Sequence, residues 1–209
     1  MRERSHSRRR GGQSANLLEL RARIAHEAAR LMTDSGLRDY AAAKHKAALR
    51  LGVGDEAALP KNSEIEEALR AYQRLFEGDA HTQLLRALRE TALEAMRFLS
   101  MFEPRLVGAV LDGTADRHSN VCLHLFSDDP DAPVRLLEEH GIPYETEQRR
   151  VRLTQDSYAE YPVLRFAADD TAIDLTVFPH DALRQPPLDR VDGKPMQRAT
   201  RPQVEALLE

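Results

Sequence analysis

Cysteine, tryptophan and aromatic residues in general are scarce in this sequence. Its 209 residues include one cysteine and no tryptophan, and aromatic residues make up 5%. A single cysteine excludes an intramolecular disulfide framework and any zinc site built from several cysteines of one chain. It is typical of a reducing compartment, so we expect a cytoplasmic protein. The shortage of aromatic rings leaves little material for surfaces that stack nucleic-acid bases.

Long hydrophobic runs and a large net charge are also missing. No stretch approaches the roughly 20 apolar residues that a membrane-spanning helix needs, so we expect no membrane partner. The net charge of −4 argues against a surface that coats nucleic acid. The N-terminal residues are basic and no apolar segment follows them, which favours a disordered tail over residues 1–14 rather than a secretion signal.

Helical periodicity dominates the first half of the chain. Apolar residues recur at three- and four-residue spacing in four successive segments between residues 15 and 103. Ser63 and Glu66 form a capping-box signature before the third segment, and Pro104 ends the fourth. Glutamates are interspersed among the lysines and arginines of these segments, which is typical of a solvated, ion-paired surface. We therefore predict a helical region over residues 15–103.

After Pro104 the pattern changes to that of a small α/β region over residues 104–209. Short apolar or alternating runs predict strands, and the segment from Asp131 to His140 predicts a helix between two of them. The predicted strands are 106–111, 120–126, 144–153, 163–168 and 172–178. Helices followed by strands make the predicted fold class α+β.

The stretch from Arg105 to Phe126 has a recognisable order of residues. An apolar run leads into Gly108-Ala109, a short turn contains Asp112-Gly113, and Ser119-Asn120-Val121-Cys122-Leu123 opens the next strand. This stretch resembles the signature of the nucleotidyltransferase superfamily, which reads apolar strand, Gly-Ser, Arg-Gly turn and Ser-Asp-x-Asp-Leu. The resemblance implies a nucleotidyltransferase-like mixed sheet with flanking helices.

The resemblance also assigns roles to individual residues. In the family, three carboxylates hold Mg²⁺ for transfer of a nucleoside monophosphate from a nucleoside triphosphate. Asn120 and Cys122 stand at two of those positions, and Asp174 of TAIDLTVF stands at the third. One carboxylate in place of three leaves two fewer negative charges for a hard cation. The turn expected to approach the nucleotide consists of Gly108, Ala109, Gly113 and Ser119.

These substitutions favour a catalytically degenerate protein that binds a nucleotide, an RNA or a protein partner. Two alternatives remain open. The first is active metal-dependent transfer, with Asp174 as the metal ligand, Asn120 as a weak second ligand and Cys122 beside them. The second is a helical protein-interaction adaptor in which the α/β region is only a scaffold.

Other chemistry is compatible with the same residues. His118, Cys122 and His124 together with Asp174 are a possible transition-metal ligand set. Cys122 with His124 as its base is a possible nucleophile, although a lone cysteine is more often a small buried residue.

Two groups of basic residues are candidate anion sites. Arg149, Arg150 and Arg152 lie close together on a predicted strand, where they either bind an anion or protect a sheet edge. A proline-rich segment follows the Asp174 strand and either covers a site or packs over the helical region. Its basic residues are Arg184, Arg190, Lys194 and Arg198.

Overall fold

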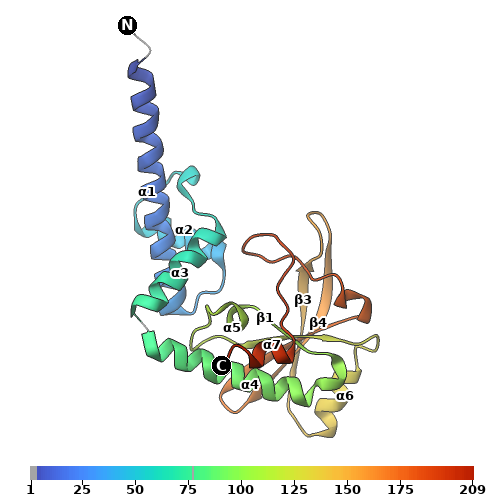
Figure 1. The fold of residues 1–209 in the computed structure, drawn as a ribbon. Coiled ribbons are helices and arrows are strands. Elements are labelled where there is room, and N and C mark those ends of the chain that lie inside the picture. The colour runs from blue at the N-terminus through green and yellow to red at the C-terminus, as the bar shows by residue number, and fades with distance from the viewer. Residues whose placement is uncertain (1–3, 77) are drawn as a thin grey trace. The chain divides into compact units, whose positions relative to one another are not determined.

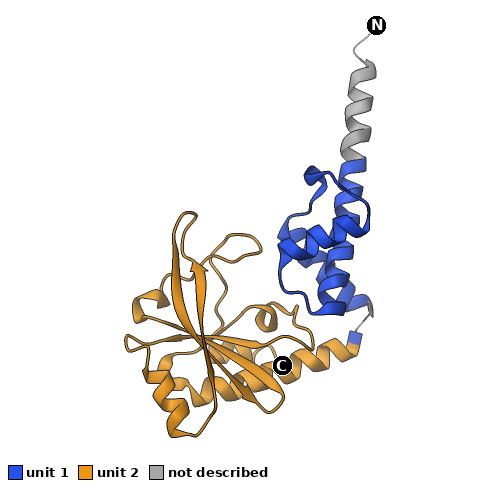
Figure 2. Ribbon diagram, turned by 180° about the vertical axis from the view of Figure 1, so that it is seen from behind, with its two compact units in different colours: residues 1–78 blue, residues 79–209 orange. Residues whose placement is uncertain are grey.

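The chain forms two compact units, residues 1–78 and 79–209 (Figure 2). The computed structural model describes the backbone of residues 4–76 and 78–209, and the side chains of residues 16–75 and 78–209. Helices precede a mixed sheet, so the predicted α+β class is confirmed. Within the described residues, no helix combines the length and the apolar character that crossing a membrane requires.

The described part of the first unit forms α1 (Arg4–Ser35), α2 (Tyr40–Arg50) and α3 (Asn62–Phe76), with a short 3-10 helix at Glu56–Ala58 before α3. Alanine is prominent among the residues buried between them, and Ala28, Ala43 and Ala47 are fully buried. Small side chains let the helices approach closely, while Ile24 and Ile65 fill the space that remains. The segment predicted as a disordered tail, residues 1–14, lies outside the residues whose side chains are described.

Asp39 caps α2, and its removal gives a direct test of this unit. Its Oδ1 accepts hydrogen bonds from the backbone N–H groups of Ala41 (2.7 Å) and Ala42 (3.2 Å). We expect Asp39→Ala to lower the free energy of unfolding by about 1 kcal/mol, because two donors of the first turn lose their acceptor. Urea unfolding followed by circular dichroism measures this loss. Asp34→Ala is the control, and an equal loss there would contradict the capping role.

The second unit contains a five-stranded sheet with the strand order β1-β2-β5-β4-β3. β2 and β5 are parallel, and the other neighbouring strands are antiparallel. Its helices and strands, in chain order, are α4 (Gly78–Phe98), β1 (Arg105–Val107), α5 (Ala109–Asp112), β2 (Val121–Phe126), α6 (Ala132–Glu139), β3 (Glu145–Arg152), β4 (Tyr158–Ala168), β5 (Thr171–Phe178) and α7 (Arg201–Glu205).

One face of this sheet is covered by helices (Figure 1). Leu123 of β2 and Leu175 of β5 are fully buried in a core to which α4, α6 and α7 contribute Met96, Leu137 and Val204. Because α4 packs into this core, the predicted change from helices to strands at residue 104 falls inside the second unit. Strand alternation sends the intervening residues of β2 and β5 to the opposite face, which carries the polar side chains.

Candidate functional site

The polar face of the sheet brings together Asn120, Cys122 and Asp174. In the parallel pairing of β2 with β5, Cys122 lies opposite Asp174, and the two side chains share a face. Asn120, directly before β2, donates from Nδ2 to Oδ1 of Asp174 at 3.2 Å. The sequence predicted this convergence through strand parity. The catalytic role of the three residues stays a prediction.

Asp174 is held by two arginines from neighbouring strands. Arg165 of β4 donates from Nε to Oδ1 (2.8 Å) and from Nη2 to Oδ2 (3.3 Å). Arg149 of β3 donates from Nη2 to Oδ2 at 2.7 Å. With the Asn120 bond, each carboxylate oxygen accepts two hydrogen bonds. The carboxylate is therefore saturated with donors.

The charge state of Asp174 follows from these contacts. Only 3% of the residue is exposed, and this burial by itself would raise the pKa of the carboxyl. The hydrogen bonds and positive charges of Arg165 and Arg149 outweigh burial and hold the pKa below its usual value. Asp174 is thus ionised at neutral pH, as the counter-ion of two guanidinium groups.

The two arginines keep donors for a further ligand. Arg149 also donates to Oγ1 of Thr176 (3.3 Å), and Arg165 also donates to Oε1 of Glu147 (2.8 Å). A guanidinium has five N–H groups, of which Arg149 uses two and Arg165 three in bonds to the described residues. Their side chains are 30% and 32% exposed. Both side chains are therefore partly accessible to solvent.

A third arginine reaches the same face from the proline-rich segment after β5. Arg198 donates from Nε to Nδ1 of His124 (3.1 Å) and from Nη1 to the carbonyl of Ala182 (2.7 Å). Its guanidinium carbon lies 4.9 Å from the ring centroid of Phe126 and 5.2 Å from that of Phe178. This segment was predicted either to cover a site or to pack over the helical region, and Arg198 lies on the polar face of the sheet.

His124 is a neutral acceptor in this arrangement. Burial, followed by the positive charges of Arg198 and Arg149, lowers the pKa of its imidazole to about 3. Because Nδ1 accepts from Arg198, the ring proton is assigned to Nε2. Burial and the charge of Arg105 lower the pKa of Arg198 to about 10, so this arginine stays charged at neutral pH.

The turn predicted to approach a nucleotide contains a short helix. The strand expected over residues 106–111 ends at Val107, because Gly108 adopts φ 71° and ψ −154° and turns the chain into α5. Ala109 is the first residue of α5, and Gly113 ends it in the left-handed conformation. Ser119 packs inside the following turn, where its Oγ accepts from the backbone N–H of Asp116 at 2.8 Å.

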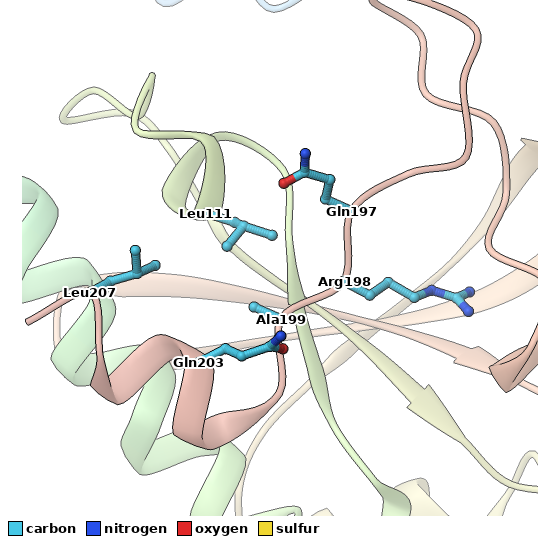
Figure 3. A pocket seen from close by; sticks show the side chains of 6 residues that line it. All are labelled: Leu111, Gln197, Arg198, Ala199, Gln203 and Leu207. Atoms are coloured by element: carbon cyan, nitrogen blue, oxygen red, sulfur yellow. The ribbon is translucent and has the colours of Figure 1, made fainter.

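A hollow of about 190 Å³ lies beside this turn. Figure 3 shows the side chains that line it. In that view the Arg198 side chain points away from Leu111 and Leu207. Its guanidinium contacts His124 and the carbonyl of Ala182 instead. The hollow presents aliphatic and amide groups. Its lining residues are Leu111, Gln197, Arg198, Ala199, Gln203 and Leu207.

The residues of the polar face do not fit a magnesium site. Both oxygens of Asp174 are occupied by cationic or amide donors, and the Cys122 thiol is too soft a ligand for Mg²⁺. Among the described residues, no group of three His, Cys, Asp or Glu side chains is placed to hold a metal. The transition-metal set with His118 and His124 therefore lacks support.

The geometry also does not support a cysteine nucleophile. The acceptor nitrogen of His124 is engaged by Arg198, and the depressed pKa makes the ring a weak base. The Cys122 thiol instead lies 3.8 Å from the carbonyl oxygen of Asn120.

Comparisons with protein families, curated proteins and solved structures found no match to this chain.

Proposed function

We propose that this chain is a nucleotidyltransferase-like protein that is catalytically degenerate and binds a nucleoside phosphate without a metal ion. One observation carries the proposal. The carboxylate at the position of the family's third metal ligand, Asp174, is occupied by the guanidinium groups of Arg149 and Arg165. The positive charges of Arg149 and Arg165 therefore lie at the position where the family binds metal cations.

Guanidinium groups suit this task. They are planar, permanently charged and able to form paired hydrogen bonds with phosphate oxygens. Arg149 and Arg165 come from neighbouring strands, both reach Oδ2 of Asp174, and both side chains are partly exposed. The half-buried ring of Tyr161, which is the register partner of Arg149, supplies an aromatic surface for a nucleoside. This combination favours a nucleotide over an RNA chain, which would require a wider basic surface.

The first test is nucleotide binding with and without magnesium. We expect isothermal titration calorimetry to detect ATP binding in EDTA with an affinity equal to or greater than that in Mg²⁺, because Mg²⁺ neutralises the phosphates that the arginines would bind. Arg149→Gln should weaken binding by about tenfold or more, since it removes a charged donor from the site.

Arg150→Gln is the matched control. Arg150 is the next residue of β3, lies on the opposite face of the sheet and stacks on Tyr158 with its guanidinium carbon 4.3 Å from the ring centroid. Equal losses in the two variants would contradict a site at Arg149. Binding that requires Mg²⁺, or transfer of labelled nucleotide to an acceptor, would favour the active enzyme. An absence of heat with every nucleoside triphosphate would favour the helical adaptor.

A further inference from the structure

Asp174 is itself an anion seated on the arginines of the proposed phosphate site. Its two oxygens take three hydrogen bonds from Arg149 and Arg165, including a paired contact with Arg165. This is the geometry in which a guanidinium recognises a phosphate group. The Asp174 side chain is 5% exposed, so its charge is poorly screened by solvent.

The balance of charge on this face gives Asp174 a large share of the negative charge. Arg149, Arg165 and Arg198 are cations there, as is Arg105, the register partner of His124. Arg105 pairs with Glu103, and Arg165 pairs with Glu147 as well as Asp174. Among the described residues, no carboxylate forms an ion pair with Arg198, whereas Asp174 pairs with both Arg149 and Arg165. Removing the charge of Asp174 would therefore leave Arg149 without a carboxylate partner among the described residues and Arg165 with only the exposed Glu147.

We infer that Asp174 is an internal counter-anion that limits the affinity of the arginine face for phosphate groups. It repels an incoming anion and also occupies three N–H donors that a phosphate oxygen would use. This inference rests on the proposed function, and it assigns Asp174 an effect opposite in sign to that of a metal ligand. Loss of a metal-binding carboxylate weakens nucleotide binding, whereas loss of a counter-anion strengthens it.

The test is Asp174→Asn in the full chain, titrated calorimetrically with ATP and with inorganic tripolyphosphate in EDTA. Asparagine keeps the size of the side chain and removes its charge. We expect affinity for both probes to rise about tenfold, the size expected for removing one like charge several ångströms away near a protein surface. The salt dependence of binding should also become steeper, because one more unit of positive charge is uncompensated.

Asp170→Asn is the control for total charge. Asp170 is exposed in the turn between β4 and β5, so its substitution changes the net charge equally without touching the arginines. Glu147→Gln is a second variant in case Asp174→Asn does not fold. Glu147 contacts Nη1 of Arg165 and its side chain is 46% exposed, so we expect a smaller rise in affinity and an intact fold.

These measurements distinguish the counter-anion role of Asp174 from the proposed binding of nucleoside phosphates. If wild-type protein binds ATP but neither Asp174→Asn nor Glu147→Gln binds more tightly than Asp170→Asn, the counter-anion role is overturned and the phosphate site stands. If neither the wild type nor any variant binds ATP or tripolyphosphate, both proposals fail. Tighter binding of ATP and tripolyphosphate by Asp174→Asn, with no change in Asp170→Asn, supports both.

Discussion

Replacing Phe178 with alanine is expected to lower the free energy of unfolding of the second unit by about 3–5 kcal/mol. Phe178, the last residue of β5, is fully buried and lies on the same face of the sheet as Asp174. Its ring centroid lies 4.6 Å from that of His124, 4.4 Å from that of Tyr161 and 6.2 Å from that of Phe126. Alanine would leave a cavity where three rings from β2 and β4 now meet.

The same substitution should loosen the segment that carries Arg198. The guanidinium of Arg198 packs over the Phe178 ring, and Ala199 exchanges two backbone hydrogen bonds with Leu106 of β1, each 2.9 Å long. Without the ring, only part of that anchoring remains. We expect Phe178→Ala to increase amide hydrogen exchange over residues 184–200 as well as to reduce stability.

Urea unfolding followed by circular dichroism provides the stability measurement, and Tyr158→Ala is the control. Tyr158 lies on β4 of the same sheet but is 49% exposed, so its truncation should cost about 1 kcal/mol or less. If Phe178→Ala costs no more than Tyr158→Ala, the cluster of rings does not stabilise this face as described.

The convergence of Asn120, Cys122 and Asp174 was predictable because it depends on alternation alone. Leu123 and Leu175 belong to runs in which every second residue is apolar, and this fixes which residues of each strand face away from the core. The pairing of the two strands came from the resemblance, and the structure places Cys122 opposite Asp174. Local pattern and one assumption about topology were sufficient.

Arg165 was missed because its role depends on register between strands. It lies between Leu164 and Phe166, so it reads as a charged interruption of a short apolar strand. β4 in fact runs from Tyr158 to Ala168, and its antiparallel pairing places Arg165 opposite Asp174. No property of residues 163–168 by themselves indicates that partner, although a buried Asp on the next strand predicts that some cation must face it.

The helix α5 was missed for a different reason. The run from Leu106 to Leu111 is apolar throughout, which suits a buried strand or a buried helix equally. The strand ends and the helix begins at Gly108, because its backbone adopts a conformation that glycine tolerates and other residues adopt only at a cost in free energy. A glycine within a short apolar run marks a possible break, but sequence alone does not show which direction the chain takes after it.

The buried imidazole of His124 gives the protein a predictable dependence on pH. The pKa of His124 is about 3 in the folded chain, against about 6.5 for a histidine in an unfolded one. Below pH 6.5, His124 therefore binds a proton in the unfolded chain but stays neutral in the folded chain. Stability from this residue is fully present above pH 6.5 and falls as the pH is lowered toward 3.

The groups around His124 explain why the folded protein resists protonation. Arg198 and Arg149 bring positive charges toward the ring, and Thr176 and Phe178 of β5 enclose it without offering a carboxylate. Protonation would also remove the acceptor for Nε of Arg198. An imidazolium here would be a buried cation beside two others.

We expect wild-type protein to be about 2 kcal/mol less stable at pH 5 than at pH 7.5 because of His124. His124→Asn isolates this contribution, because the asparagine oxygen is placed to accept from Arg198 in place of Nδ1 and does not titrate. Asp174 does not interfere, since its lowered pKa confines its titration to more acidic solution.

Urea unfolding of both proteins at the two pH values is the measurement. The unfolding free energy of wild type minus that of His124→Asn should be about 2 kcal/mol lower at pH 5 than at pH 7.5, because only the wild type loses stability as the pH falls. An identical pH dependence in the two proteins would show that His124 is not held neutral by this site.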